Sequence, residues 1–387
     1  MWEVLFWVVF ITLIYHYVGY PLVLLGLGLR RREPLRVANI TPTVSLIISA
    51  YNEQEVIRQK LDNSLDLDYP PGQLEIIVAS DGSTDRTPAI VREYAGTVTL
   101  YHYPQRRGKN AALNETVARA HGEILVFTDA NGMYRKDALR KLVQHFVDAR
   151  VGCVCGELLY RNPTGNPVAE GYNHYWRYDQ WLKRLESRLH SLLGANGSIF
   201  AIRRELNEPL HLSTSNDMVL PIKIAARGYA VLYEPEVISV EAGSAGEREE
   251  LRRRSRIVAR GLLGVWEVLP EILRRGRLLL FVQLVSRKLL RYVFPLLLTA
   301  LLVSNAFLDG FFYRAILGMQ ILPYALFPIG YALNRAGTRL RLLSLPYYFL
   351  VGNMAALLGM LKVASLRQLA MWEGFDRKYD RREETVD

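Results

Sequence analysis

The sequence predicts an α/β domain with a mainly parallel sheet, covered by helices on both faces and joined to transmembrane helices. Short apolar runs alternate with helical patterns over roughly residues 40–250, which is typical of βαβ units. Long uncharged stretches lie near both ends of the 387-residue chain, and their lengths suit a bilayer. Half of the residues are hydrophobic, which such stretches require. These observations place the chain among membrane-anchored α/β proteins.

An apolar segment at residues 1–30 predicts a retained membrane anchor. No charged residue occurs from Leu5 to Leu29, and about 25 apolar residues are enough to span a hydrocarbon core of roughly 30 Å. Only Glu3 precedes this segment, whereas a cleavable signal peptide carries positive charge before a shorter apolar core. Three arginines follow at 30–32, so the positive-inside rule predicts that the chain after residue 30 lies in the cytoplasm.

The domain at 40–250 follows a proline-containing linker, and its first half alternates strands with helices. Strands are expected at 44–49, 75–79, 98–103 and 124–128, and helices at 54–65, 88–94 and 110–120. Continuous apolar runs of this kind suit strands that are covered on both faces.

The second half of the domain is less regular. A long helix is expected at 169–193, a glycine-containing turn leading into a strand at 194–202, and a helix at 218–226. Cys153 and Cys155 lie in a strand-like run. A disulfide at that spacing would be strained and two cysteines cannot build a zinc site, so we expect buried reduced thiols.

Three apolar stretches predict transmembrane helices within residues 291–363, at roughly 292–308, 311–333 and 345–361. One crossing plus three would put the C-terminus outside. The charged tail at 364–387 contains five basic residues, which favour the inside. The sequence leaves two solutions open: one segment is re-entrant, or the tail lies outside.

The net charge of +10 has a local origin, because eleven basic residues and only two glutamates lie between residues 252 and 291. A basic, leucine-rich stretch before a membrane segment predicts amphipathic helices on an anionic lipid surface over 251–290, at ~1 kcal/mol per basic residue. Nucleic acid is the alternative partner for such charge. No recognition motif accompanies it, so we expect membrane lipids and no nucleic acid.

Three short acidic clusters define a candidate site: Asp81 within 81–85, Asp129 near Asn131, and Asp217. The first two follow apolar runs, so their carboxylates are expected at the carboxyl ends of strands, where open α/β sheets bind ligands. A carboxylate there can hold a divalent cation, and the cation can hold a diphosphate. The chain has no glycine-rich phosphate loop of either common type, which disfavours dehydrogenases and ATPases.

Four motifs, in this order, resemble those of family 2 inverting glycosyltransferases. They are Ser-Leu-Ile-Ile-Ser-Ala-Tyr-Asn-Glu at 45–53, Ala-Ser-Asp-Gly-Ser-Thr-Asp at 79–85, Arg-Gly-Lys-Asn at 107–110 and Phe-Thr-Asp-Ala-Asn at 127–131. A fifth segment, 194–205, resembles the acceptor side of membrane synthases in that family. Its members include hyaluronan, chitin and cellulose synthases and bacterial exopolysaccharide glycosyltransferases. The resemblance covers about 200 residues and implies a GT-A-like fold.

The resemblance also implies which residues hold the donor. Tyr51, Glu53 and Asp81 would bind the nucleoside, because a ring can stack on a base and carboxylates can accept from its imide or ribose groups. Lys109 would contact the nucleotide. An ordinary solvated turn is the alternative for the acidic loop.

Asp129 would bind the nucleotide together with Mg²⁺ or Mn²⁺. The family usually shows a second acid two positions later, where this chain has Asn131, whose amide oxygen coordinates without charge. The cation would neutralise the diphosphate leaving group. The alternative is that Asp129 only caps a turn at the end of a strand.

Asp217 resembles the catalytic base, which takes the acceptor proton during inverting transfer. A helix N-cap is the alternative reading. The segment from Arg253 to Ile257 resembles the Gln-x-x-Arg-Trp motif of processive synthases: Arg256 matches, whereas Arg253 replaces Gln and Ile257 replaces Trp. These arginines would clamp the diphosphate or meet the acceptor, unless they only coat the membrane surface.

Together these features predict a multi-pass membrane glycosyltransferase of the bacterial inner (plasma) membrane, with its catalytic domain in the cytoplasm. It would move a sugar from a nucleotide-diphosphate donor, expected to be a UDP-sugar, to a polysaccharide or lipid-linked glycan acceptor. One alternative is a transferase that adds a single sugar to a lipid carrier. Another is an inactive sugar-nucleotide-binding subunit of an export complex. A polymerising enzyme would need more helices for a channel, which an oligomer could supply.

Overall fold

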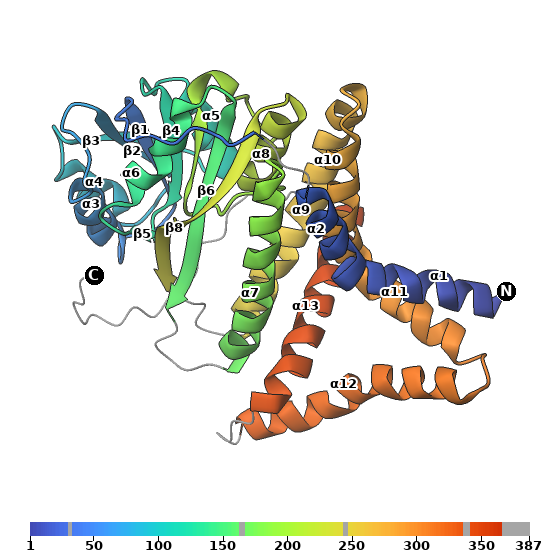
Figure 1. Cartoon of the computed structure of the whole chain (residues 1–387). Coiled ribbons are helices and arrows are strands. Elements are labelled where there is room, and N and C mark those ends of the chain that lie inside the picture. Colours follow the sequence, from blue (N-terminus) through green and yellow to red (C-terminus); the bar gives the residue numbers. More distant parts are fainter. Residues whose placement is uncertain (30–32, 162–166, 243–246, 336–340, 366–387) are drawn as a thin grey trace.

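The computed structural model describes residues 1–29, 33–161, 167–242, 247–335 and 341–365 (Figure 1). Residues 336–340, which lie between the last two expected membrane segments, and most of the charged tail at 364–387 lie outside the described residues.

An eight-stranded mixed sheet forms the centre of the α/β domain (Figure 1). Its strand order is β3-β2-β1-β4-β7-β6-β8-β5. The strands are β1 (Val44–Ala50), β2 (Leu74–Asp81), β3 (Val98–Tyr103), β4 (Ile124–Asp129), β5 (Met133–Tyr134), β6 (Val151–Arg161), β7 (Phe200–Arg203) and β8 (Ala230–Ala242). The first four strands pair in parallel, which confirms the sequence prediction for this half of the sheet.

The second half of the sheet is mixed. β7 pairs antiparallel with β4 and β6, β6 and β8 are parallel, and β5 is antiparallel to β8. The glycine-containing turn expected at 194–202 does lead into β7. The predicted helix at 169–193 ends early, at Arg188, because His190 takes a left-handed conformation with φ of 58°.

Helices cover both faces of the sheet because the strand side chains alternate. Ile47 joins a core with α5 (Lys109–Val117), α8 (Asn216–Ala226) and α9 (Glu247–Arg274). Leu46 and Ile48 point the other way. They pack with the three helices α3 (Ile57–Leu65), α4 (Thr87–Arg92) and α6 (Ala138–Val143). Two short 3₁₀ turns, η2 (Gln144–Val147) and η3 (Arg204–Leu206), complete the domain, and α7 (Pro167–Arg188) faces the membrane helices.

Cys153 and Cys155 are both buried in β6 and unpaired, as expected. Burial raises the pKa of the Cys155 thiol to about 11.

Three helical stretches of the described chain are long and apolar enough to cross a membrane: Trp2–Gly28, Leu278–Asn305 and Phe311–Ile329. The first combines α1 (Trp2–Ile14), the π-helical η1 (Tyr15–Gly19) and α2 (Tyr20–Gly28). The second combines α10 (Leu278–Gln283), the π-helical η4 (Leu284–Leu289) and α11 (Leu290–Asn305), and the third lies in α12 (Phe311–Arg335). The expected domain boundary at residue 290 therefore falls inside the second stretch.

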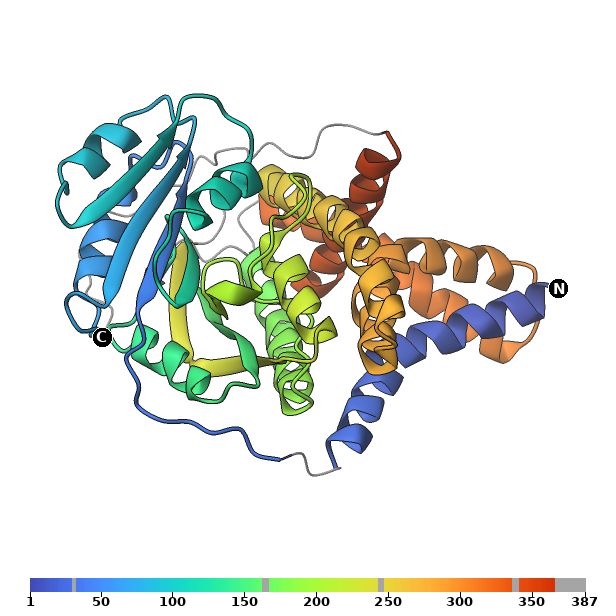
Figure 2. The same cartoon turned by 90° about the horizontal axis from the view of Figure 1, so that it is seen from above.

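The N-terminal helix packs on the C-terminal ones. α1 and α11 run side by side in both views (Figures 1 and 2), and Phe6 and Leu301 lie in one apolar cluster between them. The two π-helical segments also meet, because the Tyr15 hydroxyl lies 2.7 Å from Ser286 Oγ and His16 Nδ1 lies 2.8 Å from the Ser286 carbonyl oxygen.

The last described helix, α13 (Arg341–Ala364), lies along α9. At their contact, a Cβ on Gly359 would come within 2.8 Å of the Ser255 carbonyl oxygen, so only glycine allows this approach. Lys362 Nζ donates to Ser255 Oγ over 2.8 Å. The described apolar part of α13, Phe349–Ala364, is shorter than the three candidate spans, so the number of crossings stays a prediction.

Candidate active site

A cavity of about 880 Å³ extends from the carboxyl ends of the parallel strands to the apolar helices. Six of the residues predicted from the sequence line it: Lys109, Asp129, Asn131, Asp217, Arg253 and Arg256. Tyr51, Glu53 and Asp81 do not line it and lie at the neighbouring strand ends, β1 and β2. The predicted residues thus divide into a cavity group and a group beside it.

Asp129 and Lys109 form an ion pair at the end of this cavity that lies nearest the parallel strands. This end is called the donor end below, because the motifs predicted to hold the donor lie there. Asp129 is the last residue of β4, and Lys109 is the first residue of α5. The Lys109 ammonium lies 2.5 Å from Asp129 Oδ1, and both side chains are largely buried. The partly exposed carboxylate therefore already attracts a cation at the edge of the sheet.

Asp81 fixes the loop that delivers Lys109. Its two carboxylate oxygens accept the backbone N–H groups of Arg107 and Gly108, over 2.9 and 2.8 Å. Gly108 has φ of 100°, so glycine suits the turn into α5. Asp81 is 2% exposed and acts here as a positioning residue for the loop. Its role in binding a nucleoside stays a prediction.

Tyr51 is covered by the side chain of Arg106. The Arg106 guanidinium lies 3.9 Å from the centroid of the Tyr51 ring, which is a cation–π distance. Arg106 Nε and Nη2 are buried and have no hydrogen-bond partner among the described residues. The Glu53 backbone N–H donates to Thr87 Oγ1 over 2.8 Å, which ties this loop to α4.

The carboxylates of Asp129 and Asp217 converge on Gly197. A Cβ on this glycine would lie 3.2 Å from Asp217 Oδ2 and 3.7 Å from Asp129 Oδ2. The Ala195 N–H donates to the Asp217 carbonyl oxygen over 2.7 Å, so the glycine-containing loop and the start of α8 are held together. Ser215 takes the N-cap position of α8 and Asp217 lies in the first turn, so residues 215–217 do begin a helix, as the N-cap alternative expected. The role of Asp217 as a base stays a prediction.

The basic face of α9 completes the site. Arg253, Arg256 and Arg260 all line the cavity, because spacings of three, four and seven residues place side chains on one helical face. The Arg260 guanidinium is buried and donates to the Thr214 carbonyl oxygen. Burial lowers the pKa of Arg260, while Asp217 and Asp129 oppose this shift. Arg260 was missed from the sequence, although its helical spacing from Arg253 and Arg256 indicated it.

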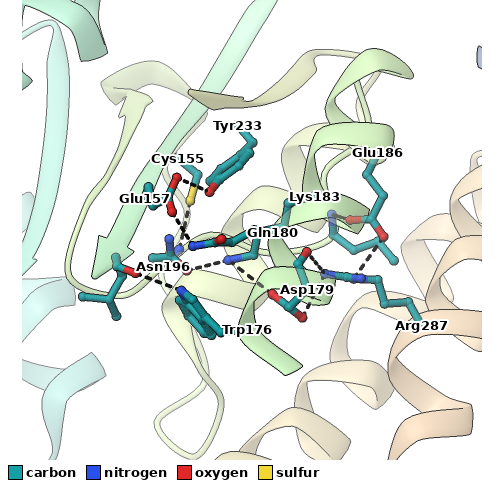
Figure 3. A network of polar contacts seen from close by, with 12 residues as sticks. Cys155, Glu157, Trp176, Asp179, Gln180, Lys183, Glu186, Asn196, Tyr233 and Arg287 are labelled. Atoms are coloured by element: carbon teal, nitrogen blue, oxygen red, sulfur yellow. Dashed lines mark hydrogen bonds and ion pairs between the residues drawn. The ribbon is translucent and has the colours of Figure 1, made fainter. Parts of the chain in front are cut away.

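Several members of a second polar network also line the cavity (Figure 3). Lys183 Nζ donates to Asn196 Oδ1, and Asn196 Nδ2 donates to the Gly156 carbonyl oxygen, each over 2.5 Å. Arg287 pairs with Asp179 over 3.1 Å and with Glu186 over 3.0 Å. The network thus connects α7, the loop before β7 and the membrane-facing segment η4.

The charged form of Asp179 is favoured by the basic side chains around it. Burial alone would raise its pKa, but Arg287, Lys183 and Arg291 together lower the pKa below its ordinary value. The carboxylate is therefore ionised inside the protein. None of the charged members of this network was predicted from the sequence as a site residue.

Asp129 and Asn131 suit a divalent cation that is shared with a substrate. No cluster of three or more His, Cys, Asp or Glu side chains occurs among the described residues. Mg²⁺ is commonly held by one or two carboxylates plus substrate phosphates, and the ammonium on Asp129 shows that the position favours positive charge. The residues fit a cation bound jointly with a diphosphate, rather than an all-protein cage.

The parallel strand ends, the two converging carboxylates and the basic helix face are arranged in a way that suits a protein with a GT-A fold. Residues 45–210 match the family described as Glycosyl transferase family 2. The resemblance drawn from the sequence motifs is thereby confirmed.

Two curated relatives match part of this chain. The probable glycosyltransferase YdaM of Bacillus subtilis is 30% identical over 227 residues, which is 56% of this chain and 54% of that protein. The beta-monoglucosyldiacylglycerol synthase of Nostoc sp. is 30% identical over 169 residues, 42% of this chain and 36% of that protein. This chain therefore spans about half or less of the length of these relatives.

A solved structure extends the similarity beyond the family domain. The mannosyltransferase PcManGT from Pyrobaculum calidifontis, in complex with GDP-Man and Mn²⁺, superposes with a TM-score of 0.65 at 26% identity. The superposition covers 93% of this chain and 99% of that one, which confirms the expected GT-A-like fold.

Proposed function

We propose that this protein is a membrane-bound inverting glycosyltransferase that moves a sugar from a nucleotide-diphosphate donor to a glycan or lipid-linked acceptor. The observation that carries the proposal is the convergence of Asp129 and Asp217 on Gly197 inside one cavity. Asp129 lies at the carboxyl end of β4, where the donor is expected. Asp217 lies in the first turn of α8, where a base could contact an acceptor hydroxyl.

Asp217 is the proposed general base. Inverting transfer needs one carboxylate that takes the proton of the acceptor hydroxyl while its oxygen attacks the anomeric carbon. The bond to the diphosphate breaks on the opposite face, and the leaving group keeps the electron pair. Two buried polar atoms of the lining, Ser198 Oγ and Asn216 Nδ2, have no hydrogen-bond partner among the described residues. Hydroxyl groups of a sugar would satisfy them.

Lys109, Asp129 and the basic face of α9 are proposed to hold the diphosphate. Arg256 and Arg260 line the cavity within reach of a ligand there, and guanidinium groups bind phosphates through paired donors. A cation held by Asp129 and Asn131 would supply charge neutralisation for the leaving group when bound. The similarity to a structure that contains Mn²⁺ supports a divalent cation.

Tyr51, Glu53 and Asp81 are proposed to meet the nucleoside beside the cavity. A UDP-sugar is the expected donor. The similar mannosyltransferase was solved with GDP-Man, so GDP-sugars belong in the same test. The proposed location is the bacterial inner (plasma) membrane, with the catalytic domain facing the cytoplasm. The three candidate spans support more than one crossing, and the arginines at 30–32 favour the cytoplasmic side for the chain that follows them.

The decisive experiment follows nucleoside diphosphate release by the full chain in detergent, with Mn²⁺, membrane lipid extract and a panel of UDP- and GDP-sugars. We expect release with one donor, and a loss of about 10²- to 10⁴-fold in Asp217→Asn. Asp66→Asn is the matched control because this exposed carboxylate lies outside the cavity. Unchanged release by Asp217→Asn would contradict the assignment of the base.

Two alternatives remain distinguishable. If purified enzyme gives products of a single added sugar, the lipid-carrier transferase is favoured over a polymerising synthase, which would need an oligomer to supply more helices. If every donor and lipid fails, although UDP binds with Mn²⁺, the inactive subunit of an export complex is favoured.

A further inference from the structure

The membrane end of the cavity combines an apolar wall with basic side chains. Phe294 of α11, Pro323 of α12 and Phe349 of α13 all line it, so the cavity reaches the helices that are candidates to cross the membrane. Nine lysines and arginines line the whole cavity, against six aspartates and glutamates. An acceptor that fills this space would need both an apolar part and negative charge.

Most of the lining charges are already paired within the protein. Arg287 is held between Asp179 and Glu186, which are buried, and Lys183 lies near Asp179 on the same network (Figure 3). Lys109 is paired with Asp129 at the other end of the cavity. Arg287 is therefore committed to the fold, and it is a poor candidate for binding a ligand.

Lys288 differs from its neighbour Arg287. Its Nζ lies 3.2 Å from the position that a Cβ on Gly194 would take, and the same position is 3.7 Å from the Asp217 carbonyl oxygen. The ammonium group thus reaches from η4 to the loop that borders the proposed base. Among the described residues, no carboxylate lies within 4.0 Å of this ammonium.

Arg291 stands one helical turn after Lys288 and also lines the cavity. Its side chain is 47% exposed, and its guanidinium lies 3.9 Å from the Asp179 carboxylate. Lys288 is thus the cation of this pair that brings to the cavity a charge with no carboxylate within 4.0 Å among the described residues. Holding such a charge beside apolar walls is unfavourable unless an anion accompanies it.

We propose that Lys288 and Arg291 form an anion-binding subsite for the phosphate of a lipid-borne acceptor. The lipid chain lies along the apolar wall made by α11, α12 and α13, and the phosphate meets the two cations. The acceptor hydroxyl is thereby delivered toward Asp217. The phosphate takes no part in bond making here. This inference rests on the proposed glycosyltransferase function and narrows its acceptor to an anionic lipid.

The test measures binding of ³²P-labelled dodecyl phosphate to the full chain in phosphatidylcholine nanodiscs, with empty nanodiscs subtracted. We expect Lys288→Met to weaken this binding at least tenfold, and Lys288→Arg to keep it within threefold of the wild type. Unlabelled inorganic phosphate should compete at least tenfold less well than unlabelled dodecyl phosphate, because it lacks the chain.

Lys362→Met is the matched control. Lys362 is also a lysine near the membrane helices, but it donates to Ser255 and does not line the cavity. Its loss should leave dodecyl phosphate binding within twofold of the wild type. The melting temperature of each variant reports whether it has folded, and the arginine variant keeps the test valid if the methionine variant has not.

UDP binding with Mn²⁺ separates this inference from the proposed function. If UDP binds and dodecyl phosphate does not, or binds equally well to Lys288→Met, the anionic subsite is wrong and the transferase stands. If inorganic phosphate competes as well as dodecyl phosphate, the site serves a free anion and the lipid assignment is wrong. If Lys288→Met loses UDP binding as well, the lysine belongs to the donor site.

Discussion

The two ends of the cavity hold their charges in different ways. At the donor end, Asp81 is bound by backbone N–H groups 26 and 27 residues away, and Lys109 pairs with Asp129 only 20 residues away. At the membrane end, Arg287 reaches Asp179 across 108 residues, and Tyr20 reaches Glu186 across 166. The donor end is built from loops at neighbouring strand ends, whereas the membrane end joins elements that are distant in the sequence.

This difference predicts which property each end controls. At the donor end, Lys109 and Asp129 line the cavity and can exchange each other for a ligand, so substitutions there should reduce activity more than stability. Membrane-end groups are buried and neutralise one another, so substitutions there should reduce stability first.

The largest effect is expected from Arg287→Met. Removing this guanidinium leaves the buried carboxylates of Asp179 and Glu186 without their main partner, which should cost about 3–5 kcal/mol of the free energy of unfolding. Thermal unfolding in detergent measures this loss. Arg314→Met is the control, because its ion pair with Asp309 is exposed and should shift the melting temperature very little. Equal decreases in melting temperature for Arg287→Met and Arg314→Met would show that the ion pairs of the membrane end do not stabilise it.

An intermediate effect is expected from Asp81→Asn at the donor end. One carboxylate oxygen becomes an amide that cannot accept from the Arg107 or Gly108 N–H, and an unmade buried hydrogen bond costs about 1–3 kcal/mol. The loop that carries Lys109 loosens, so UDP affinity with Mn²⁺ should fall about tenfold, a change that corresponds to about 1.4 kcal/mol. Isothermal titration checks the affinity. A larger decrease in melting temperature for Asp81→Asn than for Arg287→Met would contradict the expectation that the membrane end contributes more to stability.

The smallest effect is expected from Gly197→Ala. The added methyl group would contact both Asp217 and Asp129, so turnover should fall about tenfold, or about 1.4 kcal/mol in activation free energy, while the fold persists. Gly318→Ala is the control, because a Cβ on Gly318 meets no atom within 4 Å. Steady-state turnover measures the loss. Full activity of Gly197→Ala would mean that the reacting groups do not meet at this glycine.

The donor end could be predicted from sequence because its residues occur in short motifs directly after apolar strands. The membrane end could not, since Asp179, Lys183 and Glu186 look like the polar face of any surface helix. Arg287 and Lys288 were included in a basic stretch assigned to the lipid surface. The carboxylate partners of Arg287 lie about 100 residues away in the sequence, and no local pattern indicates such a distance.

The strands of the sheet also differ in how far the sequence predicts them. β1 to β4 are continuous apolar runs and were predicted close to their observed bounds. β8 was not predicted, because Glu234, Pro235 and Glu236 interrupt its apolar residues where its pairing register with β6 shifts. Its pairing partner is also distant in the sequence, and only the three-dimensional structure brings the two strands together.

The contact between the two π-helical segments has a consequence for how the protein is made. Tyr15 and Ser286 are separated by 271 residues, so the first helix leaves the ribosome long before its partner exists. At ~5–20 residues per second, that wait is roughly 15 to 50 seconds. During this interval the N-terminal helix must rest in the bilayer, or on a helper protein, with its polar side chains still unmatched. A fusion that replaces the N-terminal helix with an unrelated anchor would leave the waiting time unchanged. It would also remove the Tyr20 hydroxyl, which donates to Glu186 in the folded protein.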